Sequence, residues 1–331
     1  MCKFIILFLV SVMAVGYGHS DTFSLSETEN QLITNEADDW IDDMPDGLQD
    51  RMADAINHSL HGFLSELQYF RNLADTAGIH QYKVETKIIN GGKAGDIPMK
   101  FYTSSLPSSQ AKPLLIFFHG GGWALGSLNV TEKFCRALSS QGNVNIISVD
   151  YPLSPENPWP DAIHKCIDAV EFIRGNCEKF GSESSLISLG GDGAGGNIAL
   201  ETYEALSDKA EIRSIVVYYP LLNRSDSIDR EMKRKYGRGY GLDSRLLEAF
   251  NEAYKKETSD NISSAENSFP PILIISAGRD MIINEEKEFA VGNKDVTLIE
   301  FEGAIHGFIT DGHQNTAFKK AVEFTDIFLS K

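Results

Sequence analysis

The chain has 331 residues, of which 42% are hydrophobic and 23% charged, and it contains 28 glycines. This composition is ordinary for a globular protein and excludes a disordered chain, a collagen, a coiled coil and a disulfide-dense mini-protein. The 30 Lys and Arg residues against 47 Asp and Glu leave a net charge of −17, which repels phosphate backbones and anionic lipid headgroups. We therefore expect no nucleic-acid binding, and the charge weakly favours neutral ligands over strongly anionic ones.

The first twenty residues have the pattern of a cleavable secretory signal. Lys3 precedes an apolar run from Phe4 to Val15, and the small residues Gly16 and Gly18 follow it. A helix of that length spans about 18 Å, short of the ~30 Å hydrocarbon core of a bilayer. The alternative is a buried first helix. We expect residues 1–20 to be the signal peptide of a secreted or periplasmic protein without a stable membrane anchor.

Removal of the signal lowers the net charge to −18 and leaves three cysteines, Cys135, Cys166 and Cys177. Because three is odd, at least one thiol stays unpaired within the chain. If Cys166 and Cys177 share a helix, about 16 Å separates them, which is too far for a disulfide. We expect all three cysteines to be small buried hydrophobic residues.

The segment after the signal is polar and acidic. Residues 21–45 hold Trp40 among crowded aspartates, and the pattern predicts a mobile N-terminal arm. From Asp46 to Ala77 apolar residues recur at helical spacing, and Gly78 follows them. This spacing predicts one or two amphipathic helices.

The rest of the chain predicts an α/β protein. Val84–Ile89 and Ile97–Tyr102 flank the turn Asn90-Gly91-Gly92 and predict a β-hairpin. Short apolar strands then alternate with helical patterns; the strands are 114–118, 145–149, 186–189, 215–219, 272–276 and 297–301, and the helices lie near 130–140, 161–175, 196–207, 284–291 and 313–330. Continuous apolar strands separated by helices indicate a mostly parallel sheet covered on both faces. Residues 222–268 interrupt the alternation and are expected to form an insertion over the sheet.

The first glycine-rich motif, His119-Gly120-Gly121-Gly122-Trp123, directly follows the strand 114–118. Three glycines allow positive φ angles, so that several N–H groups can turn toward one point. The motif therefore predicts an oxyanion hole, and a flexible glycine-rich turn is the alternative.

The second motif, Gly191-Asp192-Gly193-Ala194-Gly195-Gly196-Asn197, joins a predicted strand to a predicted helix. A strand, a tight glycine turn and a helix form the setting of the nucleophile elbow G-x-S-x-G, but Gly193 stands at its centre. The competing interpretation is a phosphate-binding loop, because Gly191, Gly193 and Gly196 fit G-x-G-x-x-G. That interpretation lacks the acidic residue about 20 positions on that would hold a ribose.

Two further motifs follow predicted strands. Gly278-Arg279-Asp280 comes after the strand 272–276, and His306 comes after the strand 297–301. Functional groups of parallel sheets gather at the carboxyl ends of strands, and the order nucleophile, Asp, His is that of α/β-hydrolases. Each residue alone is more often structural. The ordered set points to Asp280 and His306 as an acid–base pair.

Together these motifs resemble the hormone-sensitive-lipase-like family of α/β-hydrolases, which includes carboxylesterases and acetyl esterases. The matching segments are HGGGW at 119–123, DYPLSPENPWPDA at 150–162, GDGAGGN at 191–197, AGRD at 277–280 and IHGF at 305–308. The resemblance implies one α/β-hydrolase domain over 46–331 with a helical cap from 46–78 and 222–268. It also implies an oxyanion hole at Gly120, Gly121, Gly122 and Ala194, with His306 as the base and Asp280 orienting it.

The sequence departs from the family pattern at two positions. Pro152 stands where the family has arginine, which alters a loop, and Gly193 stands where the family has its catalytic serine. Loss of the nucleophile costs serine hydrolases roughly 10⁶ in kcat, so ordinary ester turnover is expected to be near background. We expect no cofactor and no metal site, and a small ester or acyl compound as ligand; the oligomeric state stays open.

Four hypotheses remain. The chain could be a secreted pseudo-esterase that binds an acyl ligand. It could be an unconventional hydrolase or lyase that uses His306 and Asp280 as the general base. It could also be a serine esterase whose serine was removed by engineering or sequence error, or an interaction protein with an incidental pocket.

Overall fold

The computed structural model describes residues 23–73, 81–82, 84–93, 97–104, 109–222, 228–254, 269–310 and 313–331. The expected signal peptide lies outside the described residues. Parts of the segments expected to form the cap also lie outside the described residues, namely 74–78, 223–227 and 255–268.

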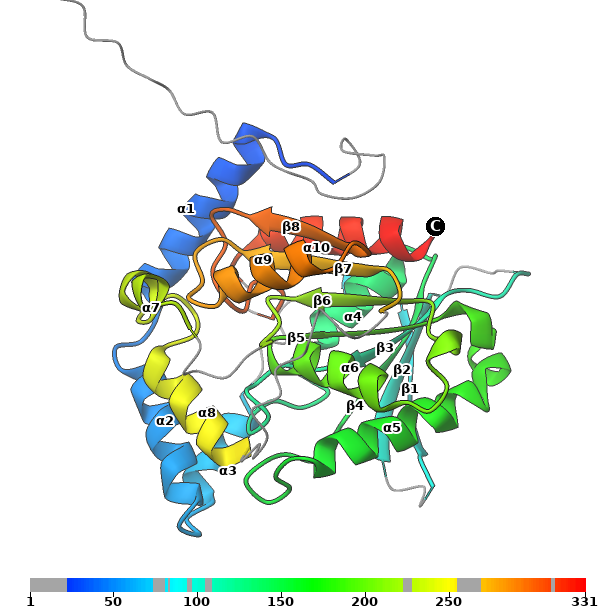
Figure 1. Ribbon diagram of the computed structural model, residues 1–331, viewed down its shortest axis with the longest axis horizontal. Helices are drawn as coiled ribbons and strands as arrows, with labels where there is room; N and C mark the ends of the chain where they lie inside the picture. The colour runs from blue at the N-terminus through cyan, green and yellow to red at the C-terminus, as the bar shows by residue number, and fades with distance from the viewer. Residues whose placement is uncertain are drawn as a thin grey trace, which may run out of the picture.

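An eight-stranded sheet runs through the molecule in the order β1-β2-β4-β3-β5-β6-β7-β8 (Figure 1). Its strands are β1 (Val84–Gly91), β2 (Ile97–Ser104), β3 (Leu114–Phe118), β4 (Asn145–Val149), β5 (Ile187–Asp192), β6 (Ser214–Tyr218), β7 (Ile272–Ala277) and β8 (Val296–Phe301). β2 pairs antiparallel with both β1 and β4, and every other pair is parallel. This confirms the α/β fold with a mostly parallel sheet and the predicted hairpin.

The central strands are buried along their whole length because helices cover both faces of the sheet. The helices that follow the strands are α4 (Glu132–Ser140), α5 (Asp161–Arg174), α6 (Ala194–Ala205), α9 (Ile283–Gly292) and α10 (Asn315–Leu329). α4 and α10 pack on one face, and α5, α6 and α9 pack on the other. β3 alternates between the two cores, with Ile116 in one and Phe117 in the other.

The acidic segment after the signal forms a helix, α1 (Glu27–Asp43), so the expectation of a mobile arm over 21–45 is wrong. Ser26 caps α1 through a capping box with Glu29. Ile33 and Ala37, one turn apart, are buried, and Ile33 belongs to the core that α10 covers. Glu29 pairs with Lys320 of α10 and Glu36 accepts hydrogen bonds from Thr316, so burial and polar contacts with α10 together hold the acidic helix in place.

Four helices lie beside the carboxyl ends of the strands: α2 (Leu48–Ser59), α3 (Ser65–Arg71), α7 (Arg230–Tyr236) and α8 (Ser244–Tyr254). They come from the two segments expected to form the cap. α2 packs against both α3 and α8.

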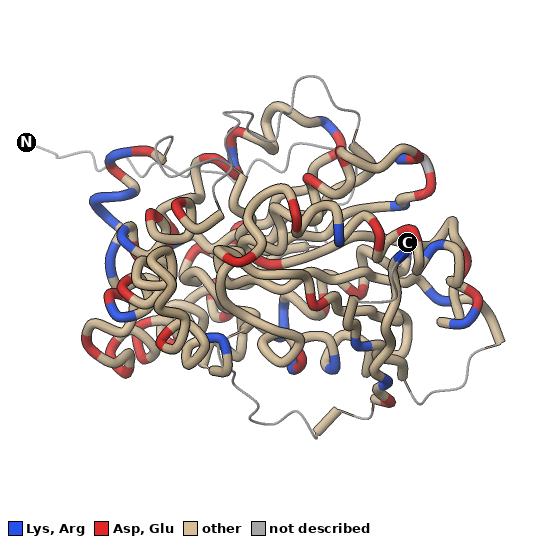
Figure 2. Tube along the Cα trace, turned by 90° about the horizontal axis from the view of Figure 1, so that it is seen from below, with Lys and Arg blue, Asp and Glu red and all other residues tan. Residues whose placement is uncertain are grey.

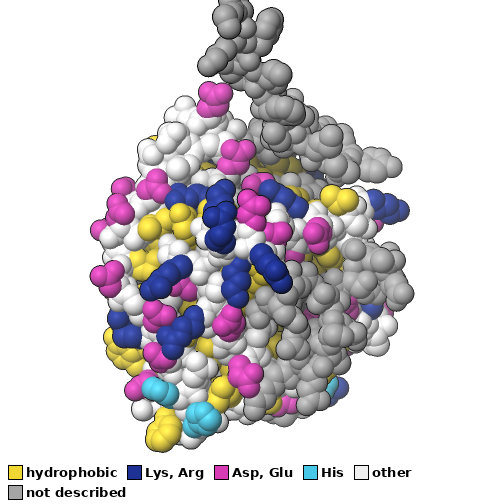
Figure 3. Space-filling view, turned by 60° about the vertical axis from the view of Figure 1, so that its left-hand side comes forward, with side chains coloured by type: hydrophobic (Ala, Val, Ile, Leu, Met, Phe, Trp, Pro, Cys, Tyr) yellow, Lys and Arg dark blue, Asp and Glu magenta, His cyan; other side chains and the backbone are white. Residues whose placement is uncertain are grey.

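Figure 2 shows that Asp and Glu are spread over the whole trace, and Figure 3 shows a face where Lys and Arg side chains gather with acidic ones between them.

Cys135, Cys166 and Cys177 are free and buried, as predicted. No helix of the described residues is both long and apolar enough to cross a bilayer.

Candidate active site

The turn between β5 and α6 has the geometry of a nucleophile elbow. Gly193 has φ 51° and ψ −116°, a conformation that side-chain-bearing residues rarely adopt. Its N–H donates to the Tyr218 carbonyl over 3.0 Å, and its carbonyl accepts from Asn197 N over 3.2 Å. The bonds to β6 and α6 fix the turn, and glycine relieves the strain that serine would carry there.

His306 faces this elbow. A Cβ added to Gly193 would lie 3.4 Å from His306 Nε2. On the far side of the ring, Nδ1 lies 2.6 Å from Asp280 Oδ2. The Asp280 side chain is 1% exposed and its other oxygen accepts from the Ile282 N–H over 3.2 Å. The His306 ring thus lies between Gly193 and Asp280. In a catalytic triad the base lies in the same way between the nucleophile and the acid.

The glycine motif after β3 supplies candidate donors for an oxyanion. Gly121 and Gly122 have φ 118° and 57°, and within the described residues their N–H groups donate no hydrogen bond. Ala194 is the first residue of α6, where N–H groups have no partner within the helix. Gly120 differs, because its N–H donates to Asp192 Oδ1 over 2.8 Å. The expectation that Gly120 contributes to the hole is therefore wrong, and Gly121, Gly122 and Ala194 remain.

Asp192 ties the two glycine loops together. Its side chain is buried and bonds to the Gly120 N–H, while the Tyr219 hydroxyl lies 3.5 Å from Oδ2. Burial raises the pKa of Asp192 to about 6, and the Gly120 N–H, His306 and Tyr219 oppose that rise. The carboxylate therefore acts as an anchor for the loop, since its acceptor atoms are already engaged.

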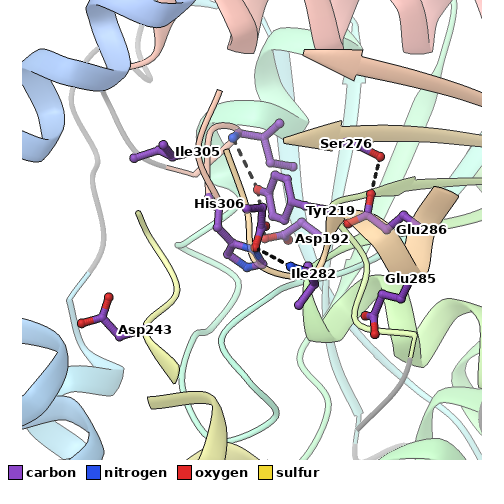
Figure 4. Close-up of polar contacts among 12 residues, drawn as sticks. Asp192, Tyr219, Asp243, Ser276, Ile282, Glu285, Glu286, Ile305 and His306 are labelled. Atoms are coloured by element: carbon purple, nitrogen blue, oxygen red, sulfur yellow. Dashed lines mark hydrogen bonds and ion pairs between the residues drawn. The ribbon is translucent and has the colours of Figure 1, made fainter. Parts of the chain in front are cut away.

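Tyr219 is a site residue that the sequence did not reveal. It follows β6, has φ 35°, and its ring lies 4.6 Å from the His306 ring. Its hydroxyl contacts Asp192 and accepts from the Ile309 N–H over 3.4 Å. Figure 4 shows Tyr219, Asp192 and His306 gathered around one point. The signal available in the sequence was only its place at the carboxyl end of a strand.

Helix α8 lies directly on the oxyanion loop. A Cβ added to Gly122 would come within 2.1 Å of the Phe250 ring, so the ring rests on the glycine itself. Trp123 stacks on Tyr254 with 4.4 Å between ring centroids. Glycine at 122 is therefore required by this close approach as well as by its positive φ.

The loops that carry Asp280 and His306 are held from outside by α1. Arg279 N donates to the Ala304 carbonyl over 2.9 Å, which joins the two loops. The Arg279 guanidinium pairs with Asp38 of α1 at 2.7 Å. Thr34 of α1 lies so close to Gly303 that a Cβ there would meet its Oγ1 at 2.2 Å. The segment that the sequence predicted as an arm thus packs against the loops that carry Asp280 and His306.

A second buried carboxyl group lies near Asp280. Glu286 of α9 accepts a hydrogen bond from Ser276 and is fully buried (Figure 4). Burial, with the negative charges of Asp280 and Glu285 nearby, raises its pKa well above the usual range. Burial of Glu286 beside Asp280 therefore favours the neutral form of the Glu286 carboxyl group.

The loop with the unexpected Pro152 is held by Arg71 of α3. Arg71 forms a two-pronged ion pair with Glu156 at 2.7 and 2.8 Å. It also donates to the carbonyls of Ser154 and Ala124. The side chain thus links α3, the Pro152 loop and the end of the oxyanion loop.

Within the described residues no cluster of three His, Cys, Asp or Glu side chains could hold a metal ion.

Comparison with known proteins agrees with this geometry. A family model described as the alpha/beta hydrolase fold matches residues 115–310. The chain is 29% identical over 236 residues to the carboxylic ester hydrolase LipN of Mycobacterium tuberculosis, a match that covers 66% of this chain and 62% of that protein. The chain therefore spans less than two thirds of the length of this relative.

Solved esterases share the fold. An esterase of Pyrobaculum calidifontis superposes with a TM-score of 0.68 at 24% identity, covering 93% of this chain and 98% of the other. A fungal esterase of Rhizomucor miehei also gives 0.68, at 22% identity, covering 90% and 95%. Like the sheet order, these matches show the α/β-hydrolase fold. The chain belongs to the hormone-sensitive-lipase-like family of α/β-hydrolases, the family that its motifs resemble.

Proposed function

We propose that this chain binds a small ester or acyl ligand at the His306 site, with serine-esterase activity absent or very weak. The observation that carries the proposal is the 3.4 Å between His306 Nε2 and the Cβ position of Gly193. A serine there would place its hydroxyl against the base, and glycine has no hydroxyl to deprotonate. The hydrogen bond between Asp280 and His306 and the positions of Gly121, Gly122 and Ala194 support the ligand-binding part of the proposal.

Binding would use the groups that an esterase uses for its substrate. The carbonyl oxygen of the ligand would accept from Gly121, Gly122 and Ala194, and its acyl or alcohol part would lie against Phe250. Preorganised donors in a water-poor site bind a carbonyl oxygen without reorganisation, whether or not a reaction follows. Ligands of this kind should therefore raise the melting temperature through preferential binding to the folded state.

The decisive experiment compares Gly193→Ser with Gly193→Ala on the p-nitrophenyl esters of acetate and butyrate. We expect the native protein and Gly193→Ala to be near background, and Gly193→Ser to be faster by about 10³ or more. A fluorophosphonate probe should label only Gly193→Ser. Robust turnover by the native protein, abolished in His306→Ala, would contradict the proposal.

A second candidate function is hydrolysis by a water that His306 activates directly. Apart from the chain neighbours of Gly193, the described residues place only His306 atoms within 4 Å of its Cβ position, which leaves room for a water there. Water would give a proton to Nε2 while its oxygen attacks the acyl carbon. The ester C–O bond then breaks, and the leaving alkoxide takes the proton back from His306. No covalent intermediate forms, so turnover of activated esters should show no burst and should vanish in His306→Ala.

We also propose that residues 1–20 are removed on export, on the basis of the basic, apolar and small-residue pattern described above. The mass and N-terminal sequence of protein recovered outside the producing cell test this. Recovery of a chain that retains Met1 would contradict it.

A further inference from the structure

Basic side chains gather on α7 and the loop after it, although the protein has a net charge of −17. We call this set the basic rim, and it consists of Arg230, Lys233, Arg234, Lys235 and Arg238. In Figure 1, α7 lies at the left of the molecule. Figure 3 turns this side toward the viewer and shows basic side chains clustered on it. Figure 2 shows several basic residues at the same end of the trace.

Few of these charges are neutralised within the described residues. Lys233 pairs with Glu248 at 2.8 Å. Arg238 is 3.6 Å from Asp50, and its side chain remains 84% exposed. No carboxylate of the described residues lies within ion-pair distance of Arg230 or Arg234, and both are exposed. The same segment also carries the exposed carboxylates of Asp229 and Glu231, so the rim presents five cationic groups and two anionic ones.

The stability of α7 does not explain this arrangement. The helix dipole favours Lys233, Arg234 and Lys235 in the last turn. It disfavours Arg230 at the start of the helix, and it does not reach Arg238 beyond the end. Arg230 and Arg234 are one turn apart, and like charges at that spacing destabilise a helix. The charges at the two ends of the rim thus oppose folding or leave it unchanged, which suggests an external anion.

The rim is joined to the candidate active site by a short loop. Gly241 packs on His306 so closely that a Cβ there would lie 2.2 Å from the His306 carbonyl oxygen. The neighbouring Tyr240 ring lies 5.1 Å from the Arg279 guanidinium, next to Asp280. Arg238 comes three residues before Gly241, so their Cα atoms are within about 11 Å of each other. Arg238 therefore belongs to the loop that packs against the main chain of His306.

We propose that the ligand of the His306 site carries an anionic group, a carboxylate, phosphate or sulfate, that the basic rim binds. Its ester or acyl end then lies at His306, and the inference rests on the function proposed above. The net charge of the whole chain favoured neutral ligands, but charges more than a Debye length of ~8 Å away are largely screened. The charges close to the site therefore decide which ligand is attracted.

The test measures binding of four acetate esters to the full chain by calorimetry. Three carry an anion, namely 3-acetoxypropanoate, 2-acetoxyethyl phosphate and 2-acetoxyethyl sulfate, and 2-methoxyethyl acetate is the neutral counterpart. We expect at least one anionic ester to bind about tenfold tighter than the neutral one at low salt, with the advantage shrinking at high salt. The three anionic arms show which group the rim prefers.

The matched variants are Arg234→Glu/Arg238→Glu and, as a control with the same charge change, Lys294→Glu/Lys319→Glu at exposed positions outside the rim. The rim variant should lose about tenfold in affinity for the anionic ester and keep its affinity for the neutral one. The control should keep both affinities, and circular dichroism checks the fold of each variant.

Equal binding of neutral and anionic esters would overturn the inference and leave the proposed function standing. An anionic preference that survives in the rim variant would also overturn it. If none of the four esters binds, the proposed function fails and the inference fails with it.

Discussion

The two glycine-rich loops that meet at the site differ in the room they leave for a side chain. On the oxyanion loop, a Cβ at any of the three glycines would meet another atom at 2.4 Å or less. On the elbow loop a Cβ at three glycines would also come closer than 3.0 Å to another atom, with nearest atoms at 2.4 Å for Gly191, 2.1 Å for Gly195 and 2.9 Å for Gly196. Gly193 alone has its nearest neighbour at 3.4 Å, and that neighbour is His306 Nε2.

This difference separates two reasons for glycine. Six of the glycines are required by packing, because backbone or buried side chains occupy the place of a Cβ. Gly193 is favoured by its positive φ, but the fold leaves room for a side chain there. Packing therefore does not require the absence of a side chain at 193, whereas it does require glycine at the other six positions.

The largest effect we predict tests this contrast on stability. Gly195→Ala places a Cβ 2.1 Å from the Phe118 carbonyl oxygen and should cost roughly 3 kcal/mol or more, or prevent folding. Gly193→Ala meets no such obstacle and should cost only about 1–2 kcal/mol for its positive φ. Urea denaturation measures both, and equal costs would break the comparison.

A second prediction concerns Asp192, which joins the two loops. Its pKa is raised from 3.8 to about 6 by burial, so the folded state binds this proton more tightly than the unfolded chain. This group therefore stabilises the fold less as the pH rises through that window, by ~3 kcal/mol in all. Asp192→Asn keeps an acceptor for the Gly120 N–H and does not titrate.

The stability of Asp192→Asn relative to the native chain should therefore increase as the pH rises from below 3.8 to above 6. Urea titrations at several pH values measure the difference, with the exposed Asp295→Asn as a control. Parallel pH profiles for the native chain and Asp192→Asn would show that the carboxyl between the loops is not perturbed.

The smallest effect concerns how His306 is held opposite Gly193. Asp38→Asn removes the ion pair between α1 and Arg279. Because the Asp38 side chain is half-exposed, this change should lower the free energy of unfolding by less than about 1 kcal/mol. In the Gly193→Ser background it should slow fluorophosphonate labelling a few-fold, because the loops of Asp280 and His306 lose one restraint. The neighbouring Asp39→Asn should leave the labelling rate unchanged, and equal rates for the two variants would exclude a positioning role for α1.

Local sequence patterns were sufficient for the elements that contact the sheet. The strands 114–118 and 145–149 have the predicted bounds, because a strand buried on both faces is a short apolar run with polar ends. The pairing of Asp280 with His306 was predicted from chain order, since parallel strands bring their carboxyl ends to one edge. α7 was not predicted, because a seven-residue charged helix has almost no apolar periodicity to read.

Long-range contacts explain what the sequence alone did not predict. The acidic α1 has a capping box and two buried residues, but its burial depends on α10 some 280 residues away. Gly120 matched a family motif as a donor, and only the approach of Asp192 showed that its N–H is engaged. The roles of Tyr219 and Phe250 likewise depend on which loops and helices meet at the site.

The sequence by itself determined the fold class, the acid–base pair and the absence of a hydroxyl at position 193, because each follows from residue type and order along the chain. The tertiary structure alone decided that the Cβ position of Gly193 lies 3.4 Å from His306 Nε2, that Asp192 engages the Gly120 N–H, and that the loop after α7 packs on His306. These properties depend on distances between segments that are remote in sequence, and packing of the whole chain sets such distances.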